Sequence, residues 1–78
     1  MIKFIDLFAG LGGIRLGFTQ AAQELNIETE CVFTSEIKPS AIEAMRFNFK
    51  DNTIEKVDIT QVHEKDIPSF NILLGGFP

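Results

Sequence analysis

The sequence KFIDLFAGLGG, residues 3–13, combines the signals of a buried strand and of a ligand-binding turn. Residues 3–8 form a short apolar run that ends at a glycine-rich segment, which is typical of a strand buried on both faces of a sheet. Gly10, Gly12 and Gly13 allow a tight turn and let a ligand approach the main chain, because no Cβ stands in the way. A turn with only a structural purpose is the alternative, but three glycines in four positions exceed what such a turn needs.

The rest of the chain alternates between helix-like and strand-like segments. Residues 13–25 are expected to form a helix with one apolar stripe, and Gly17 would let that helix pack closely against a sheet. A second strand is expected at 28–36 and a second helix at 39–49, where Pro39 suits the first helical position. Two further strands are expected at 53–60 and 71–76. The stripe of the first helix comprises Ile14, Phe18, Ala21, Ala22 and Leu25, and that of the second comprises Ile42, Met45 and Phe49.

This alternation predicts an α/β fold with about four mostly parallel strands and two main helices. At 78 residues the chain forms one domain at most, and a small one. The fourth strand is expected to pair with the first, on the side away from the second. That order creates a crevice at the carboxyl ends of the strands, where open α/β sheets bind their ligands.

Composition excludes several classes of protein. A hydrophobic share of 45% argues against disorder, and a net charge of −4 with scattered basic residues is not the footprint of a surface that grips nucleic acid. One cysteine, Cys31, allows neither an internal disulfide nor a Cys-x-x-Cys metal cluster, and no metal site is expected. The N-terminus is neither a signal peptide nor a membrane span, so a cytoplasmic location is expected.

The residues around the glycines favour S-adenosylmethionine over a nucleotide phosphate. A dinucleotide fingerprint counted from Gly10 fails, because Arg15 stands at the third glycine position. No Gly-Lys-Ser/Thr follows, so the turn is not a phosphate loop. Asp6, near the end of the first strand, would repel an anion but tolerates a zwitterion that carries an amino group and a sulfonium.

Two acidic residues are expected at the ends of the second and third strands. Glu36 stands where α/β nucleotide folds place an acid that accepts hydrogen bonds from both ribose hydroxyls, with a solvated surface glutamate as the alternative. Asp58 is close enough to the crevice to bind an adenine amino group, with a turn-forming aspartate as the alternative. Phe8 and Ile59 are apolar residues at strand ends, and an adenine sandwiched between them would explain their position.

Four segments of the chain resemble the opening motifs of the DNA cytosine-5 methyltransferases, the bacterial modification methylases: FIDLFAGLGGIRLGF, SEIKPSA, DITQVHEKDIP and ILLGGFP. The resemblance covers essentially all 78 residues. It implies a Rossmann-like S-adenosylmethionine-dependent methyltransferase fold, of which residues 1–78 are the N-terminal half: a single partial domain that binds the cofactor.

The resemblance also implies a role for each matching residue. Phe8 packs on the adenine, Glu36 binds the ribose hydroxyls, and Asp58 with Ile59 recognises the adenine. The backbone of Ala9, Gly10, Leu11, Gly12 and Gly13 wraps the methionine part, and Gly76, Phe77 and Pro78 close the site. Three positions depart from the family: Ile37 replaces a frequent Trp against the adenine, Lys38 replaces an Asp that caps the second helix, and Asn71 replaces a common Asp.

The resemblance further implies methyl transfer to C5 of a cytosine flipped out of duplex DNA, with a Cys nucleophile that follows Pro78 in the family. The sequence stops one residue short of that Cys, so no catalytic residue is assigned and the chain alone is expected to be inert. Duplex DNA would be bound by the missing remainder, a C-terminal part or a second subunit. Cys31, in mid-strand, cannot substitute for the nucleophile, and His63 is interpreted as a solvated side chain.

Other functions remain open on the sequence. A non-catalytic module that binds S-adenosylmethionine, or that only assembles with a partner, is the main alternative. A nicotinamide-dependent oxidoreductase is supported only by fold analogy. The apolar strand over 71–75 would lie at an open sheet edge, so self-association through that strand is expected.

Overall fold

The computed structural model describes residues 1–10, 12–49, 54 and 57–75. Three of the expected site residues, Leu11, Gly76 and Pro78, and also Phe77, lie outside these described residues. Within them the chain forms three strands, two α-helices and two short 3-10 helices: β1 (Ile2–Leu7), α1 (Gly13–Glu24), β2 (Thr29–Thr34), α2 (Pro39–Asn48), η1 (Ile59–Gln61), η2 (Glu64–Asp66) and β3 (Ile72–Gly75).

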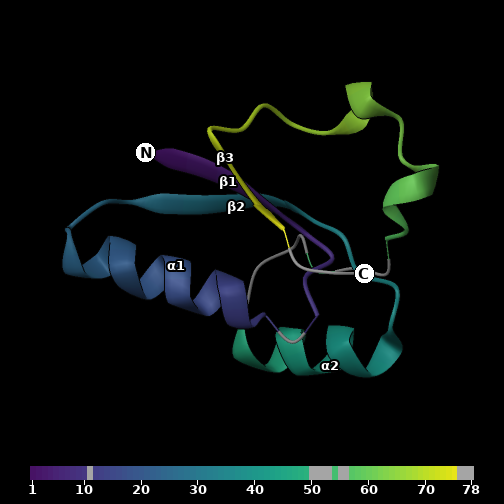
Figure 1. Ribbon diagram of the computed structural model, residues 1–78, viewed down its shortest axis with the longest axis horizontal. Helices are drawn as coiled ribbons and strands as arrows, with labels where there is room; N and C mark the ends of the chain where they lie inside the picture. Colours follow the sequence, from purple (N-terminus) through teal and green to yellow (C-terminus); the bar gives the residue numbers. More distant parts are fainter. Residues whose placement is uncertain (11, 50–53, 55–56, 76–78) are drawn as a thin grey trace.

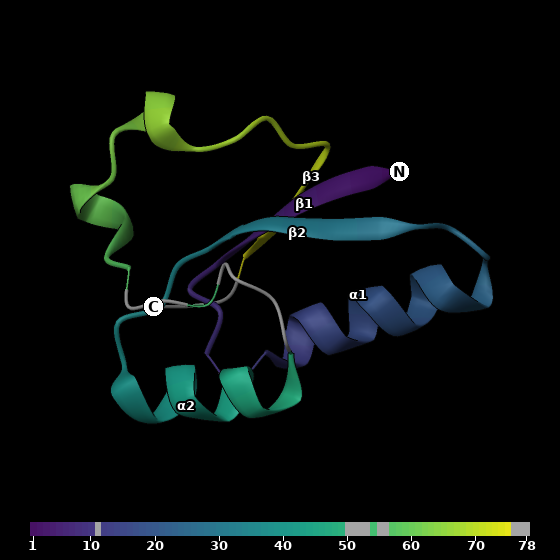
Figure 2. The ribbon, with the colours of Figure 1, turned by 180° about the vertical axis from the view of Figure 1, so that it is seen from behind.

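The three strands form one parallel sheet in the order β2-β1-β3 (Figure 1). The expected α/β class and the pairing of the last strand with the first are therefore confirmed. Both helices lie on one side of the sheet, and the segment that carries η1 and η2 lies on the other side, as the view from behind also shows (Figure 2). The sheet thus forms the middle layer of the described residues.

The expected strand over 53–60 is not confirmed. Among its described residues only Val57 pairs with another strand-like position, in a single antiparallel bridge with Glu36. The Asp58 side chain accepts a hydrogen bond from Thr60 N and starts η1, so the backbone turns immediately after Val57. The local hydrogen bond from Thr60 N to the Asp58 side chain thus takes the place of strand pairing after Val57. The described part of the chain accordingly has three strands rather than four.

The central strand β1 is buried on both faces, as predicted. Phe4, Ile5 and Asp6 are each only 1% exposed. Phe4 packs against Phe18 of α1 with ring centroids 4.9 Å apart in an edge-to-face arrangement. This contact fixes α1 against one face of the sheet.

The predicted inward stripe of α1 is only partly correct. Arg15 and Ala22 are buried and Phe18 and Thr19 are half-buried, whereas three members of the predicted stripe are exposed: Ile14, Ala21 and Leu25. Arg15 is inward because its guanidinium lies 4.4 Å from the ring centroid of Phe49 and 5.8 Å from that of Phe4. The faces of aromatic rings attract the guanidinium, and the apolar part of the arginine side chain packs against its neighbours. An arginine therefore occupies a position that hydropathy alone predicts to be exposed.

The predicted stripe of α2 is confirmed. Ile42 and Met45 form a buried cluster with Ile54, and Phe49 and Ala9 pack against it. Gly12 meets the same cluster: a Cβ added there would lie 2.6 Å from a Phe49 ring carbon. Gly17 is different, because it is exposed and an added Cβ would meet nothing within 4 Å. The expectation that Gly17 brings α1 close to the sheet is therefore wrong, and Gly12 is the glycine that allows close packing.

We predict that Gly12→Ala lowers the free energy of unfolding by about 2 kcal/mol or more, because Gly12 has a φ of +85° and the new methyl group would collide with Phe49. Gly17→Ala is the matched control, and it should raise the same quantity by about 0.5–1 kcal/mol, since alanine favours a helix. Urea unfolding followed by circular dichroism measures both. Equal stabilities for the two variants would contradict the packing described for Gly12.

Candidate functional site

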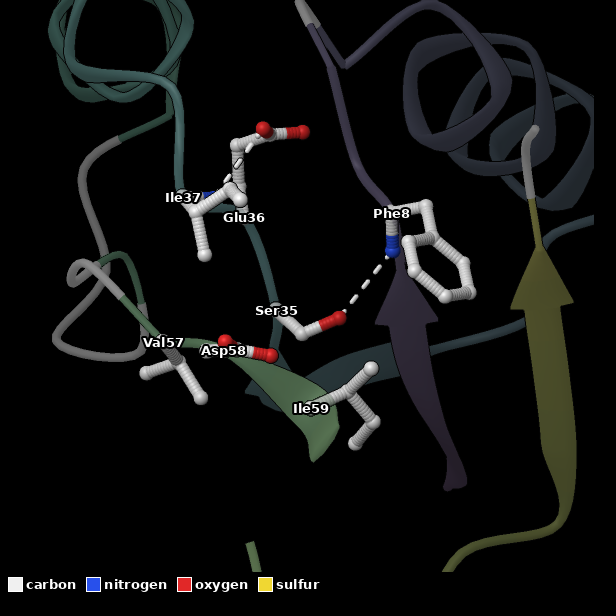
Figure 3. A pocket seen from close by; sticks show the side chains of 7 residues that line it. All are labelled: Phe8, Ser35, Glu36, Ile37, Val57, Asp58 and Ile59. Carbon is white, nitrogen blue, oxygen red and sulfur yellow. Dashed lines mark hydrogen bonds between the residues drawn. The ribbon is translucent and has the colours of Figure 1, made fainter. Parts of the chain in front are cut away.

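A cavity of about 130 Å³ opens at the carboxyl ends of β1 and β2 (Figure 3). Its walls come from three segments that are distant in sequence: the residue after β1, the residues between β2 and α2, and the start of η1. Five of its lining residues were predicted as site residues and two, Ser35 and Val57, were not. The lining residues are Phe8, Ser35, Glu36, Ile37, Val57, Asp58 and Ile59.

Phe8 supplies an aromatic wall of this cavity and is 37% exposed. Its backbone has a φ of +53°, a left-handed conformation that is rare for an aromatic residue. Phe8 N donates to Ser35 Oγ at 3.0 Å, and the next amide, Ala9 N, donates to Ser35 O at 2.9 Å. Ala9 itself packs against the α2 cluster, so its methyl group serves the core rather than the cavity.

Glu36 is held by three backbone N–H groups. Its Oε1 accepts from Gly10 N at 2.6 Å, and its Oε2 accepts from Ile37 N and Lys38 N, both at 3.0 Å. Burial alone would raise the pKa of Glu36, but the bonds from Lys38, Gly10 and Ile37 and the Lys38 charge outweigh burial and lower that pKa. The alternative of a solvated surface glutamate is therefore wrong.

Asp58 both forms a turn and lines the cavity. Its Oδ1 accepts from Thr60 N at 2.9 Å and from Thr60 Oγ1 at 2.7 Å. The hydroxyl bond and then the amide bond of Thr60 lower the pKa of Asp58, against a small opposing effect of burial. Both bonds use Oδ1, so Oδ2 can accept a hydrogen bond from a ligand. The turn-forming alternative is thus correct for this residue without removing it from the cavity, where Ile59 lies next to it.

The three glycines of the turn have different surroundings. Gly10, with a φ of +58°, and Gly13 each face open space, because an added Cβ would meet nothing within 4 Å. Gly12 faces the Phe49 ring instead. The turn is therefore open to a ligand at Gly10 and Gly13 and closed by protein at Gly12.

Asp6 lies directly before this turn as a buried carboxyl group. It is 1% exposed, and its Oδ2 has no hydrogen-bond partner among the described residues. Burial raises the pKa of Asp6 to about 6; the Arg15 charge lowers it and the Glu36 charge raises it further. A negative charge is therefore held close to the turn at a cost in stability.

The sequence signal for Ser35 was available but weak. A hydroxyl residue beside a strand end is common, and only the pairing of β1 with β2 shows that this one faces the residue after β1. Val57 has no signal in the sequence, because its place in the cavity depends on the bridge to Glu36. Among the described residues no group of acidic, His or Cys side chains could hold a metal ion, and no helix is long and apolar enough to cross a membrane.

The fold and the cavity define an α/β protein with a cavity at the carboxyl ends of parallel strands. The model of the C-5 cytosine-specific DNA methylase family matches residues 2–78, and the chain belongs to that family. It is 54% identical over 77 residues to the Type II methyltransferase M.NgoBV of Neisseria gonorrhoeae and 55% identical over 78 residues to M.HgiCI of Herpetosiphon aurantiacus. The identity to M.HhaI of Haemophilus parahaemolyticus is 44% over 77 residues.

The chain spans only about a fifth of the length of these relatives. The matched segments cover 99%, 100% and 99% of this chain but 18%, 18% and 21% of M.NgoBV, M.HgiCI and M.HhaI. The resemblance seen in the four sequence motifs is thus confirmed, for a segment that is a small part of each relative.

We predict that Asp6→Asn changes how stability depends on pH. Because the folded pKa of about 6 lies above the ordinary value of 3.8, the folded state takes up a proton first as the pH falls. The wild type should therefore gain stability relative to the variant, by up to about 3 kcal/mol, between pH 7 and pH 4. Urea unfolding at several pH values measures the difference.

Asp58→Asn is the control with the opposite sign. The pKa of Asp58 is lowered, so the wild type should lose stability relative to this variant as the pH falls through the folded pKa. A difference between wild type and Asp6→Asn that stays constant from pH 7 to pH 4 would contradict a buried, proton-binding Asp6.

Proposed function

We propose that this chain is the S-adenosylmethionine-binding segment of a bacterial modification methylase that methylates C5 of cytosine in duplex DNA. The observation that carries the proposal is the convergence of Phe8, Glu36, Asp58 and Ile59 on one cavity. Two apolar side chains and two carboxylates suit a nucleoside, whose base is flat and whose ribose and amino group donate hydrogen bonds. The cofactor supplies an electrophilic methyl group on a sulfonium.

Glu36 fits the ribose, with one constraint from its present bonds. A carboxylate offers about four acceptor positions, and Gly10, Ile37 and Lys38 use three of them. One ribose hydroxyl can therefore donate to Glu36 directly. A second would replace the Gly10 N–H bond, which is the one that joins Glu36 to the glycine turn.

The first turn of α1 fits the carboxylate of the methionine part. Gly12, the N-cap, has no side chain to cap the helix, and the first turn contains no acidic residue. The helix start thus offers N–H groups and a partial positive charge to an anion. Asp6, buried just before the turn, provides negative charge near the place where the amino group and sulfonium would lie.

Methyl transfer to cytosine needs residues beyond this sequence. C5 of cytosine is a poor nucleophile until a thiolate adds at C6. The one cysteine, Cys31, is buried in β2 and not in the cavity. The net charge of −4 also argues against a DNA-gripping surface here. We propose that a further polypeptide segment, in the same chain or a second subunit, supplies the nucleophile and the DNA contacts, and that these 78 residues alone are inactive.

A non-catalytic module that binds S-adenosylmethionine is the second candidate, favoured because no cysteine is among the residues that line the cavity. A nicotinamide cofactor fits less well. Its pyrophosphate would meet the buried charge of Asp6, and Arg15, which stands at the third glycine position of the dinucleotide fingerprint, packs between Phe4 and Phe49.

Calorimetry with S-adenosylhomocysteine tests the cofactor assignment. We expect binding by the 78-residue chain, no competition by NAD, and at least a tenfold loss in Glu36→Ala. Because Glu36 also holds Gly10, the matched variant is Glu36→Gln, which keeps acceptor and shape but loses the charge; a smaller loss is expected there, since a bond to a charged acceptor is stronger. Unchanged affinity in both variants would remove Glu36 from the site.

We also propose that the chain self-associates through β3. This strand lies at the edge of the described sheet, and its Leu73 is 52% exposed. An apolar open edge invites pairing with another strand.

Light scattering at increasing concentration should show dimers or larger species that Leu73→Lys reduces, because a charge on an edge strand opposes pairing. Phe47→Lys is the control, since Phe47 is 84% exposed on α2, away from this edge. A wild type that stays monomeric, or equal effects of the two variants, would contradict association through β3.

A further inference from the structure

The backbone of Phe8 is in a conformation that its own sequence does not explain. Among the described residues two that are not glycine have a positive φ, Phe8 at +53° and Asn26 at +57°. Asn26 follows α1, where a left-handed residue ends many helices and asparagine is well tolerated. An aromatic residue has no such preference and is disfavoured there. Something in the surrounding structure therefore holds Phe8.

Ser35 makes the contacts that surround Phe8 along the chain. Ser35 N donates to Asp6 O at 2.9 Å, and Ala9 N donates to Ser35 O at 2.9 Å. Between these two backbone bonds, Phe8 N donates to Ser35 Oγ at 3.0 Å, which Figure 3 shows as a dashed line. The backbone bonds fix the residues on either side of Phe8, and the hydroxyl is the contact to Phe8 itself. Ser35 is 1% exposed, so water does not readily replace that hydroxyl.

We propose that Ser35 is a positioning residue, which holds Phe8 in its left-handed conformation and so keeps the Phe8 ring at the cavity. If φ relaxed to a negative value, the direction of the Cα–Cβ bond would change and the ring would leave its present place. The proposal rests on the proposed function only for the identity of the ligand that the ring contacts. The Ser35 hydroxyl acts on that ligand through Phe8.

The first test needs no ligand. In the isotope-labelled chain, the intraresidue N–H to Hα nuclear Overhauser effect is strong at a residue with positive φ. We expect this signature at Phe8 in the wild type and in Ser35→Thr, which keeps the hydroxyl, and its loss in Ser35→Ala. Asn26 is an internal control and should keep the signature in every variant. Retention of the signature at Phe8 in Ser35→Ala would overturn the proposal.

A second comparison covers the case in which Ser35→Ala does not fold. Glycine adopts a positive φ without strain, so Phe8→Gly removes the need for a constraint on φ. Ser35→Ala should then be tolerated better in the Phe8→Gly background, giving a higher unfolding midpoint relative to that background than relative to the wild type. An equal or larger loss in the Phe8→Gly background would show that Ser35 acts independently of Phe8.

Binding of S-adenosylhomocysteine separates this proposal from the proposed function. Ser35→Ala should weaken binding by about 3- to 10-fold, the usual scale of an aromatic contact. In the Phe8→Ala background it should cause no further loss, and a further loss of the same size would overturn the positioning role. A wild type that binds no S-adenosylhomocysteine but shows the Phe8 signature and its loss in Ser35→Ala would overturn the cofactor assignment and support the role of Ser35.

Discussion

The cavity depends on the connection between the end of β2 and the turn after β1. Ser35 and Glu36 follow the last residue of β2, and they bind the end of β1 and the turn after it. Ser35 N donates to Asp6 O, Phe8 N donates to Ser35 Oγ, and Ala9 N donates to Ser35 O. Gly10 N donates to Glu36 Oε1. Two of these bonds join backbone groups, and the other two are made by the Ser35 and Glu36 side chains. Because the turn is fixed in this way, the cavity forms in a sheet whose described part has only three strands.

The same connection places charge where it is costly. Asp6 is buried and Glu36 is partly buried. The burial of Asp6 raises its pKa, and the nearby charge of Glu36 raises it further. Arg15 offsets part of this effect from between the Phe4 and Phe49 rings. A chain of 78 residues has little stability to spare, and Asp6 is a carboxyl group that favours the unfolded state at neutral pH, so its charge has a cost for the fold.

Much of the fold follows from local sequence. The glycines after an apolar run indicated β1 and α1, and Pro39 marked the start of α2, because these signals act within a few residues. The strand expected over 53–60 is not confirmed, because among its described residues Asp58 bonds to Thr60 and begins η1. The inward face of α1 was partly wrong because Arg15 is stabilised by rings from β1 and from the residue after α2, which helical periodicity does not include.

The sequence predicted five of the residues that line the cavity by their type, and it missed those whose place depends on contacts. Phe8, Ile37 and Ile59, and the carboxylates Glu36 and Asp58, all line the cavity. The glycines differ in their surroundings, because Gly10 faces open space whereas Gly12 packs against Phe49. This difference depends on the position of α2, which the local sequence does not give. Ser35 was missed because its function is a bond to the backbone of another strand end, and a side chain that positions a neighbour has no motif of its own.

Glu36 also resolves a departure from the family pattern. The resemblance to the family led us to expect an acidic residue in place of Lys38 at the start of α2, and Lys38 makes no side-chain capping bond. The Glu36 carboxylate, however, accepts from Lys38 N and places negative charge near the positive end of the helix. The Glu36 carboxylate therefore partly caps α2, and its other oxygen accepts the hydrogen bond from Gly10 N. The bond to Gly10 uses Oε1 and the bonds to Ile37 N and Lys38 N use Oε2, so different oxygens of one carboxylate hold the glycine turn and the start of α2.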